Sequence, residues 1–359
     1  PHATRESLAR WFAPFDAETG KVVRAARDHA AVAPRPKLSE VYTTVPGGQD
    51  VFFLRRGEVE NKAGKAAPGV VQVLSRGAAE RPAADPRVAL ADWMTDADRG
   101  AGPLAARVIV NRVWQHHFGR GIVGTPNDFG AQGERPTHPE LLEYLASELV
   151  RGGWKLKPLH RLVMLSETYR QSHEVDPANI KLDPDNRLLW HSRPRRLEAE
   201  VIRDALLAAG GNLDPAMYGP SVLDATPRRS IYLRVKRSEL LPVLTTFDAP
   251  EPTQSIGERS VTTVPTQALA MMNSPFVRRQ AENLAARIAP PGGAPLAGAV
   301  DRGYRIALGR PPTAAERDRM VAFVDRERTA GGGTPAATRA ALVEFCHALL
   351  CLNEFVYID

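Results

Sequence analysis

The densest group of residues able to do chemistry lies between positions 107 and 138. Imidazole, carboxylate, amide and guanidinium groups in one short segment could line a polar pocket, hold a metal ion or exchange protons with a substrate. Their spacing helps to distinguish these possibilities. The candidate pocket comprises Arg107, Asn111, Gln115, His116, His117, Asp128 and His138.

The two adjacent histidines do not have the spacing of a metal site on one helix. Neighbouring residues on a helix point about 100° apart, whereas paired histidine ligands are four residues apart, as in H-E-x-x-H. A metal would need one of them together with Asp128, His138 or His160 from elsewhere in the chain. We therefore predict no metal site, with one of the two histidines buried and hydrogen-bonded and the other exposed.

Arg107, Asn111 and Gln115 share one face of a helix predicted over residues 103–119, with Gly119 as its C-terminal cap. The opposite side of that helix is apolar as well, so the helix should be central and its polar residues need partners. One interpretation is that they hydrogen-bond the Gly- and Pro-rich segment 119–136, whose backbone otherwise lacks partners. The other is that the whole candidate set converges on a ligand pocket.

No complete catalytic motif is present. NDFG at 127–130 resembles part of a protein kinase signature, but no Gly-rich loop and no lysine strand accompany it. There is no G-x-S-x-G motif, and Ser166 and Ser221 have no assigned base, so a hydrolytic triad stays an open alternative. Glu198 and Glu200 could serve glycoside chemistry, but exposed helices carry such carboxylate pairs routinely. No catalytic residue is assigned from the sequence.

Cys346 and Cys351 are the two cysteines of the chain. Five residues apart on a helix they point about 140° apart, so a disulfide between them is not expected. Two cysteines are too few for a disulfide framework or a Cys-rich zinc module, and there is no C-x-x-C-H sequence for covalent haem attachment. We therefore expect no cofactor in this chain.

Positive charge is in excess, because 47 Lys and Arg residues face 41 Asp and Glu residues, giving a formal charge of +6. A polysaccharide, a nucleic acid or a membrane surface would suit this balance. Because the excess is spread along the chain, nucleic acid is not the expected partner. The candidate anion-binding residues are Arg193, Arg195, Arg196, Arg234 and Lys236, although residues so separated are also typical of a solvated surface.

Helical periodicity dominates the elements that must position these residues. Capping boxes at Thr137/Glu140 and Thr313/Glu316 predict two helix starts. Leu197, Val201 and Ala205 are expected to form the buried stripe of a helix over 193–211. Other predicted helices cover 103–119, 158–170 and 262–288, the last with a break at Pro275.

Strands or extended arms are predicted at 51–58 and 69–74, and one further strand at 230–235, because these are short apolar runs. The fold class is therefore mainly α, a multi-helix globular bundle with minor short β-strands or extended arms.

Composition divides the chain into four parts. Residues 1–40 are expected to form a helical piece and a tether, and 41–289 a main helical domain with an extended arm. Residues 290–300 are a predicted linker, and 301–359 a helical hairpin packed on the main domain. No apolar run is long enough to predict a membrane span. The start lacks a signal-peptide pattern and an initiator Met, which fits a processed chain or a fragment.

Several long strings resemble a planctomycete-type domain of unknown function. The longest, starting at Pro103, is PLAARVIVNRVWQHHFGRGIVGTPNDFGAQGERPTHPELLEYLASELVRGGWKLKPLHRLVMLSETYRQS. Further matches are DPDNRLLWHSRPRRLEAEVIRDALL, RRSIYLRVKRS, TFDAPEPTQSIGERSVTTVPTQALAMMNSPFV, YRIALGRPPTAAE and CLNEFVYID. The matching strings are dense and in order, so the resemblance is specific.

The resemblance implies the C-terminal part of an exported, extracytoplasmic protein of the periplasm or cell envelope, with upstream domains that include a cytochrome-c-like module. Haem is implied only for that other module. The family has no assigned reaction, so the resemblance transfers no catalytic residue. We predict a scaffold or binding module for a partner domain (cytochrome c) or an anionic polysaccharide. The alternative is a carbohydrate-active or sulfate-ester-processing enzyme with its site near residues 107–138.

Overall fold

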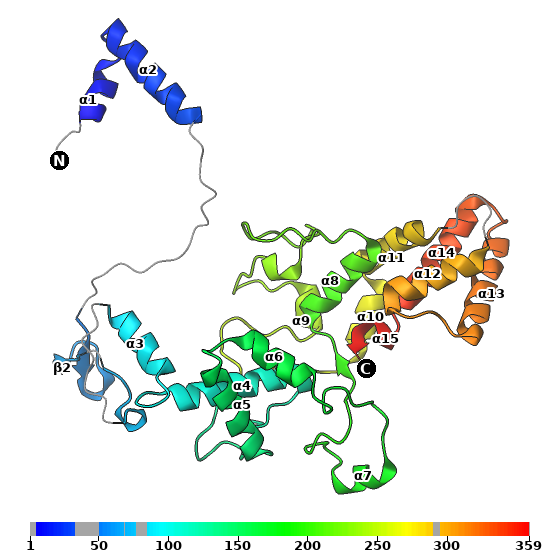
Figure 1. Cartoon of the computed structure of the whole chain (residues 1–359). Coiled ribbons are helices and arrows are strands. Elements are labelled where there is room, and N and C mark those ends of the chain that lie inside the picture. Colours follow the sequence, from blue (N-terminus) through cyan, green and yellow to red (C-terminus); the bar gives the residue numbers. More distant parts are fainter. Residues whose placement is uncertain (1–4, 33–49, 68, 77–84, 290–294, 359) are drawn as a thin grey trace. The chain divides into compact units, whose positions relative to one another are not determined.

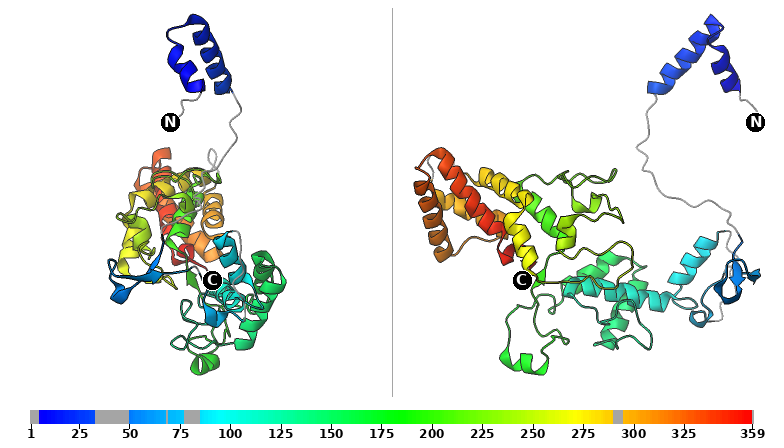
Figure 2. Two further views of the ribbon diagram at one scale, coloured as in Figure 1. Left: turned by 90° about the vertical axis from the view of Figure 1, so that its left-hand side faces the viewer. Right: turned by 180° about the vertical axis from the view of Figure 1, so that it is seen from behind.

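The computed structural model describes residues 5–32, 50–67, 69–76, 85–289 and 295–358. The chain forms two compact units, Pro1–Lys65 and Ala66–Asp359 (Figure 1, Figure 2). The described residues form fifteen α-helices and two antiparallel sheets of two strands each. The predicted mainly α fold class is confirmed.

The first unit contains a helical hairpin and a β-ribbon. Trp11 and Phe15 contact each other where the hairpin turns, with ring centroids 5.7 Å apart. In the ribbon Phe52 pairs with Lys65, which confirms a strand inside the predicted 51–58 segment. The elements are α1 (Arg5–Phe12), α2 (Ala17–Val32), β1 (Phe52–Leu54), the 3₁₀ turn η1 (Arg55–Gly57) and β2 (Lys62–Lys65).

The second unit has two apolar cores, and the first is built on α4, α5 and α6. Val110 and Trp114 of α4 pack with Leu145 and Leu149 of α5 and with Leu159 of α6. Burial of such side chains contributes about 1.5–3 kcal/mol each. The elements of this part are η2 (Gln72–Leu74), α3 (Pro86–Thr95), α4 (Gly102–Phe118), α5 (Pro139–Arg151), α6 (Leu156–Met164) and α7 (Pro177–Leu182).

The second core joins the C-terminal helices to α8. Ile202 of α8, Leu284 of α11, Val300 of α12 and Phe345 of α14 are fully buried in it. Helix α14 lies beside α11 and α13 (Figure 1). The elements are β3 (Arg195–Arg196), α8 (Ala199–Gly210), η3 (Ser230–Tyr232), α9 (Pro242–Thr246), α10 (Pro265–Asn273), α11 (Pro275–Ile288), α12 (Leu296–Leu308), α13 (Ala314–Ala330), α14 (Pro335–Leu350), α15 (Asn353–Val356) and β4 (Tyr357–Ile358).

Two predicted helix boundaries are confirmed by their local chemistry. Asn273 ends α10, and Ser274 caps α11, whose first residue is Pro275, so the break predicted at that proline is correct. Thr313 and Glu316 form the predicted capping box at the start of α13.

The capping box predicted at Thr137 and Glu140 is wrong. The backbone N–H and the hydroxyl of Thr137 both donate to the Ile122 carbonyl, so the Thr137 side chain is not available to cap a helix. Pro139 takes the first helical position, for which its fixed φ is suited, and His138 becomes the N-cap without a side-chain cap bond.

The helix predicted over 193–211 begins later, at Ala199, because Arg195 and Arg196 pair as strand β3 with β4. The predicted stripe is also displaced, since Ile202 and Leu206 are buried whereas Val201 is 45% exposed. The segment 69–74, predicted as a strand or extended arm, ends in the 3₁₀ turn η2, and the strand predicted at 230–235 begins as the 3₁₀ turn η3 and continues with Leu233 in an isolated bridge to Val222. At η3 the buried Ser230 donates from its N–H and its hydroxyl to the Asp204 carboxylate of α8, a tertiary contact that overrides local β-propensity.

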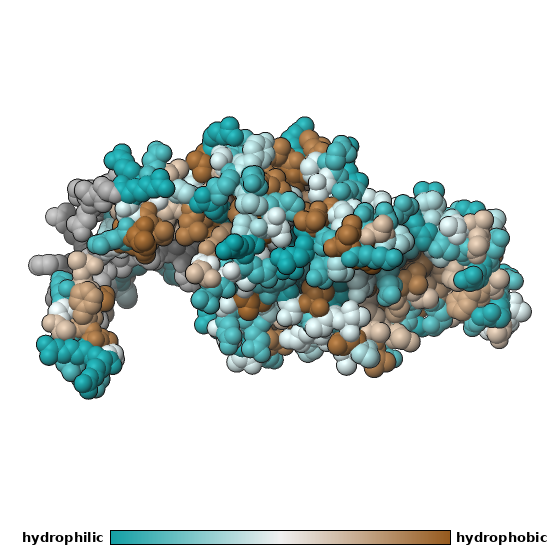
Figure 3. Space-filling model, turned by 90° about the horizontal axis from the view of Figure 1, so that it is seen from below, coloured by the Kyte–Doolittle hydropathy of each residue, from teal (hydrophilic) through white to brown (hydrophobic). Residues whose placement is uncertain are grey.

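The division into four parts by composition remains a prediction. Of the predicted linker, residues 290–294 lie outside the described residues, and α12 already begins at Leu296. Of the predicted N-terminal tether, residues 33–40 also lie outside them. None of the described helices combines the length and the apolar character needed to cross a membrane. Figure 3 shows apolar residues interspersed with hydrophilic ones on one face.

Candidate functional site

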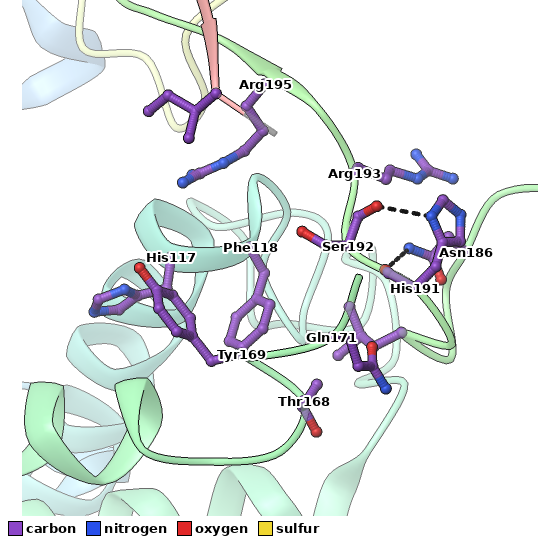
Figure 4. A pocket seen from close by; sticks show the side chains of 12 residues that line it. His117, Phe118, Thr168, Tyr169, Gln171, Asn186, His191, Ser192, Arg193 and Arg195 are labelled. Carbon is purple, nitrogen blue, oxygen red and sulfur yellow. Dashed lines mark hydrogen bonds between the residues drawn. The ribbon is translucent and has the colours of Figure 1, made fainter. Parts of the chain in front are cut away.

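A cavity of about 170 Å³ lies where the end of α4, the segment after α6 and strand β3 meet (Figure 4). Its lining combines an apolar floor at Phe118 with imidazole, phenol, amide, hydroxyl and guanidinium groups. This mixture of one apolar surface with a few convergent polar groups is typical of small-molecule sites. The polar groups of the lining include those of His117, Tyr169, Gln171, Ser192, Arg193 and Arg195.

The C-terminal end of α4 and strand β3 position the cationic side of this cavity. Gly119 ends α4 in the left-handed conformation, with φ of 85°, as its predicted capping role requires. Arg195, which is paired with Ile358 of β4, reaches over this end and donates from Nη1 to the His116 carbonyl at 2.7 Å. A Cβ added at Gly119 would lie 3.2 Å from Arg195 Cδ, so the arginine stem lies directly against the glycine.

The opposite wall of the cavity is formed by a loop whose two ends are hydrogen-bonded to each other. The Ser192 N–H donates to the Ser172 carbonyl at 2.9 Å, which joins the two ends of the loop that carries α7. Inside the loop, the buried Asn186 donates to the His191 carbonyl at 2.8 Å and accepts from the Trp190 N–H at 2.9 Å. These bonds fix the backbone that presents Ser192 and Arg193, so the wall is preformed.

His117 lies in contact with a second histidine. Its Nε2 is 2.8 Å from Nδ1 of His160, and its ring packs nearly perpendicular to that of Tyr169, with centroids 5.4 Å apart. Burial lowers the pKa of His117 below its ordinary value of 6.5, and the nearby charges of His160, Arg195 and His116 lower this pKa further. The neutral imidazole is therefore favoured near neutral pH.

Neither Arg193 nor Arg195 forms a salt bridge among the described residues, although the charge of Arg193 helps to lower the pKa of the nearby Asp183 carboxyl group. Their neighbour Arg196, by contrast, is almost completely buried and pairs with Asp248 at 2.6 Å. Arg195 is held by a backbone carbonyl, and Arg193 is exposed at the rim. The cavity therefore carries two guanidinium groups whose charge no ion pair neutralises within the described residues.

The chain belongs to the family described as Protein of unknown function (DUF1553), PSD1. Its family profile matches residues 86–324, which include every cavity-lining residue except Ile358. The expected domain of unknown function is thereby confirmed. No curated protein and no solved structure gives a significant match.

Within this DUF1553 chain, Arg107 is placed away from the cavity. It forms a bidentate pair with Glu143, with Nε–Oε1 at 2.6 Å and Nη2–Oε2 at 2.7 Å. Both residues line a second, more open hollow of about 520 Å³ between α4 and α5. The hydrogen bonds expected from Arg107 to segment 119–136 are thus replaced by an ion pair to α5.

Asn111 has the structural role that the Gly/Pro-rich segment requires. Fully buried, it donates to the Val123 carbonyl at 2.9 Å and accepts from the Val123 N–H at 2.8 Å. Both backbone groups of that crossover residue are satisfied by one side chain. For Asn111 the prediction that it holds segment 119–136 is confirmed.

The remaining candidates from the sequence are dispersed. Gln115 is half-buried, and His116 is exposed, as expected for one member of the histidine pair. Asp128 accepts the Gly130 N–H at 2.8 Å, and His138 contacts the Thr137 hydroxyl at 2.9 Å. Of the seven residues proposed as one pocket, the cavity is lined by His117 alone.

The candidate anion-binding residues also separate. Arg193 and Arg195 line the cavity, whereas Arg196 is buried in its pair with Asp248. Arg234 is exposed, and Lys236 pairs with Glu239 at 2.9 Å.

Tyr169, Gln171 and Ser192 are cavity residues that no sequence motif indicated. They come from irregular segments and reach the cavity only because α6 packs on α4 and because β3 pairs with β4. The sequence offers one indirect signal, His160, which is the partner of His117 in the structure.

The described residues contain no cluster of three or more His, Cys, Asp or Glu side chains placed to hold a metal ion. Cys346 and Cys351 are free thiols. Burial raises the pKa of both thiols above the ordinary range, so neither is an activated nucleophile.

Proposed function

We propose that this DUF1553 chain is a binding module whose cavity takes the acidic group, a carboxylate or a sulfate, of an anionic glycan. The observation that carries the proposal is Arg195, which lines the cavity and forms no salt bridge among the described residues, with Arg193 exposed at the rim. Guanidinium groups bind carboxylate and sulfate-like oxyanions through two parallel hydrogen bonds.

The other residues that line the cavity have side chains able to contact a sugar. Phe118 offers an apolar face, and the side chains of Tyr169, Gln171 and Ser192 can exchange hydrogen bonds with hydroxyl groups. A cavity of about 170 Å³ is smaller than the roughly 300–1,000 Å³ of drug-sized pockets. We therefore assign it one acidic sugar residue and not a whole oligosaccharide.

His117 gives the proposed binding a pH dependence. An anion bound beside it favours the imidazolium form, so binding raises the His117 pKa. By linkage, affinity for the anion increases as pH falls through the pKa of His117.

The wider setting follows from the family resemblance. We propose that the chain is part of an exported, extracytoplasmic protein of planctomycete type, located in the periplasm or cell envelope. Its upstream domains, including a cytochrome c module, are the proposed protein partners. Haem then belongs to that module, because this chain has no C-x-x-C-H sequence.

Calorimetric titration tests the glycan proposal. The probes are chondroitin sulfate and polygalacturonate oligosaccharides, with neutral dextran oligosaccharides as the reference. Arg195→Gln should weaken binding of the acidic probes about 10- to 100-fold, because a hydrogen bond to a charged group contributes about 1.5–3 kcal/mol. Arg339→Gln is the matched control, since Arg339 is exposed on α14 away from the cavity.

Equal binding of dextran, or unchanged binding by Arg195→Gln, would contradict the proposal. Arg195→Lys refines the result. It keeps the charge and loses the fork geometry, so its affinity should lie between those of wild type and Arg195→Gln.

A second candidate function is that of an enzyme acting on carbohydrate or sulfate esters, and one observation favours it. His117 is hydrogen-bonded to His160, its pKa is lowered, and Arg195 is close to it, which is an arrangement suited to a general base beside an anionic substrate. Release of sulfate or of new reducing ends from sulfated oligosaccharides, abolished in His117→Gln, would support it. Intact oligosaccharide after prolonged incubation would rule it out.

A further inference from the structure

A second surface, which shares no residue with the cavity, combines exposed apolar side chains with cations that form no salt bridge among the described residues. It belongs to the segment between α8 and α9, which projects away from the helices of the second core (Figure 1, Figure 2). We call it the 214–237 face. Its apolar side chains, 55% to 76% exposed, are Met217, Tyr218, Leu223, Ile231 and Val235.

This face is held in place by a buried arginine. Arg203 of α8, with only 1% of its side chain exposed, donates to the carbonyls of Asp224, Thr226 and Arg228 at 2.7–3.0 Å. It also pairs with the Asp224 carboxylate at 3.2 Å. The exposed apolar side chains therefore stand on an anchored loop, and several large apolar side chains left exposed on one ordered segment point to an interaction surface.

The two halves of the segment are also joined to each other. The Val222 N–H donates to the Tyr232 carbonyl at 2.8 Å, and the Arg234 N–H donates back to the Val222 carbonyl at 2.9 Å. Tyr218 has a left-handed backbone, with φ of 64°, which is unfavourable for a tyrosine. Its N–H donates to the Tyr232 hydroxyl at 2.8 Å, and its carbonyl accepts from Arg228 at 2.6 Å, so the strained residue is fixed from both sides.

The charge of the face is positive. Its carboxylates are already used: Asp224 pairs with Arg203, Glu239 pairs with Lys236 at 2.9 Å, and Asp214 accepts the Ala216 N–H. Within the described part of the chain no carboxylate pairs with the exposed cations Arg229, Arg234 and Arg237.

We propose that the 214–237 face rests on the surface of an anionic lipid bilayer. Aliphatic side chains on a projecting loop enter the boundary between headgroups and acyl chains, and flanking arginines bind the lipid phosphates. The apolar residues are mainly aliphatic and stand on a projection, which fits an interface of headgroups better than the aromatic-filled recess of a protein contact. This peripheral contact requires no membrane-spanning helix and does not depend on the glycan proposal.

Vesicle co-sedimentation of the full chain tests the proposal. One set of vesicles is phosphatidylcholine alone, and the other is an equal mixture of phosphatidylcholine and phosphatidylglycerol. The chain should bind the anionic vesicles and not the neutral ones, and binding should weaken as salt is added. Arg234→Gln with Arg237→Gln should lower the partition coefficient about 25-fold, at about fivefold for each cation near the surface.

The apolar contribution is tested with Ile231→Asp and Val235→Asp together, which should abolish binding. The matched controls are Leu182→Asp, another exposed apolar side chain on α7, and Arg305→Gln, another exposed arginine on α12; both should bind as wild type does. Circular dichroism reports the folding of each variant. If the aspartate pair unfolds, Ile231→Ser takes its place and should reduce binding severalfold.

Three outcomes would overturn the proposal. One is no sedimentation with anionic vesicles, which would leave an acidic protein as the occupant of the face. The second is unchanged binding by the variants of the 214–237 face. The third is binding that Arg195→Gln removes and the variants of the face do not, which would place the lipid headgroup in the cavity.

Discussion

Asn111 shows what a single polar residue does in this fold. It is fully buried on α4, and its amide satisfies both backbone groups of Val123 in the crossover between α4 and α5. A polar residue at a core position is unfavourable unless its partners are present. The need for partners could be predicted from the sequence, whereas the identity of Val123 as that partner could not.

Asn111→Ala should lower the free energy of unfolding by about 2–4 kcal/mol, because it leaves a buried N–H and a buried carbonyl without partners. Urea denaturation measures this change. Gln115→Ala, one turn further along α4 and half-buried, is the control and should change stability by less than about 1 kcal/mol. Similar losses for both variants would contradict the role given to Asn111.

The lowered pKa of His117 predicts that the stability of the protein depends on pH. Its pKa is lowered by folding, so its contribution is fully present above pH 6.5, the unfolded value, and is lost as pH falls through the lower folded value. The free energy of unfolding should therefore decrease from pH 7.5 to pH 5, and the decrease should be smaller in His117→Gln.

Denaturation at both pH values checks this prediction, with His173→Gln, an exposed histidine, as the control that keeps the wild-type slope. If the free energy of unfolding of His117→Gln decreased with falling pH as much as that of the wild type, the burial and the charges assigned to His117 would be contradicted.

The histidine pair marks the limit of sequence reasoning at this scale. Helical geometry alone predicted that His116 and His117 diverge, and in the structure His116 is exposed whereas His117 is hydrogen-bonded but half-buried instead of buried. The same geometry could not predict Tyr169 or Arg195 beside His117, because these contacts depend on packing between elements far apart in the chain.

At the scale of elements, the C-terminal end of α4 has two roles, because it terminates the helix and also forms part of the proposed binding site. Gly119 is both the left-handed cap of α4 and the surface on which the Arg195 stem lies. Its capping role was readable from the sequence, because glycine tolerates positive φ. Its contact with Arg195 was not, since Arg195 and Arg196 were predicted to be helical and instead form β3, which pairs with the C-terminal strand β4.

Gly119→Ala should therefore have two effects. The left-handed backbone should reduce the free energy of unfolding by about 1–2 kcal/mol, and the new methyl group, 3.2 Å from Arg195 Cδ, should displace the guanidinium and weaken anion binding. Gly309→Ala is a matched control, because Gly309 caps α12 with φ of 72° and an added Cβ would have no neighbour within 4 Å.

Both variants should lose similar stability, measured by thermal denaturation, and Gly119→Ala alone should lose anion affinity. Full affinity in Gly119→Ala would show that the cavity does not need Arg195 in its present position.

At the scale of the whole molecule, the cavity and both apolar cores belong to the unit Ala66–Asp359. The mainly α class was predictable, because amphipathic periodicity is a local property. The grouping of the helices into two cores with a cavity beside β3 was not, because it is set by non-local packing.

A chain that starts at residue 66 should keep the thermal midpoint of the second unit and the anion affinity of the full protein, because the contacts described for the cavity lie within that unit. Calorimetry and titration of this shortened chain test the prediction. Loss of the cooperative transition would show that residues 1–65 contribute to the core.

The most direct test of the anion-binding cavity is the pKa of His117, followed by NMR of the imidazole with and without a sulfated disaccharide. Bound anion should raise this pKa in the wild-type protein and have little effect on the His117 pKa in Arg195→Gln. An unchanged His117 pKa at saturating disaccharide, or an equal rise in Arg195→Gln, would contradict the proposed site.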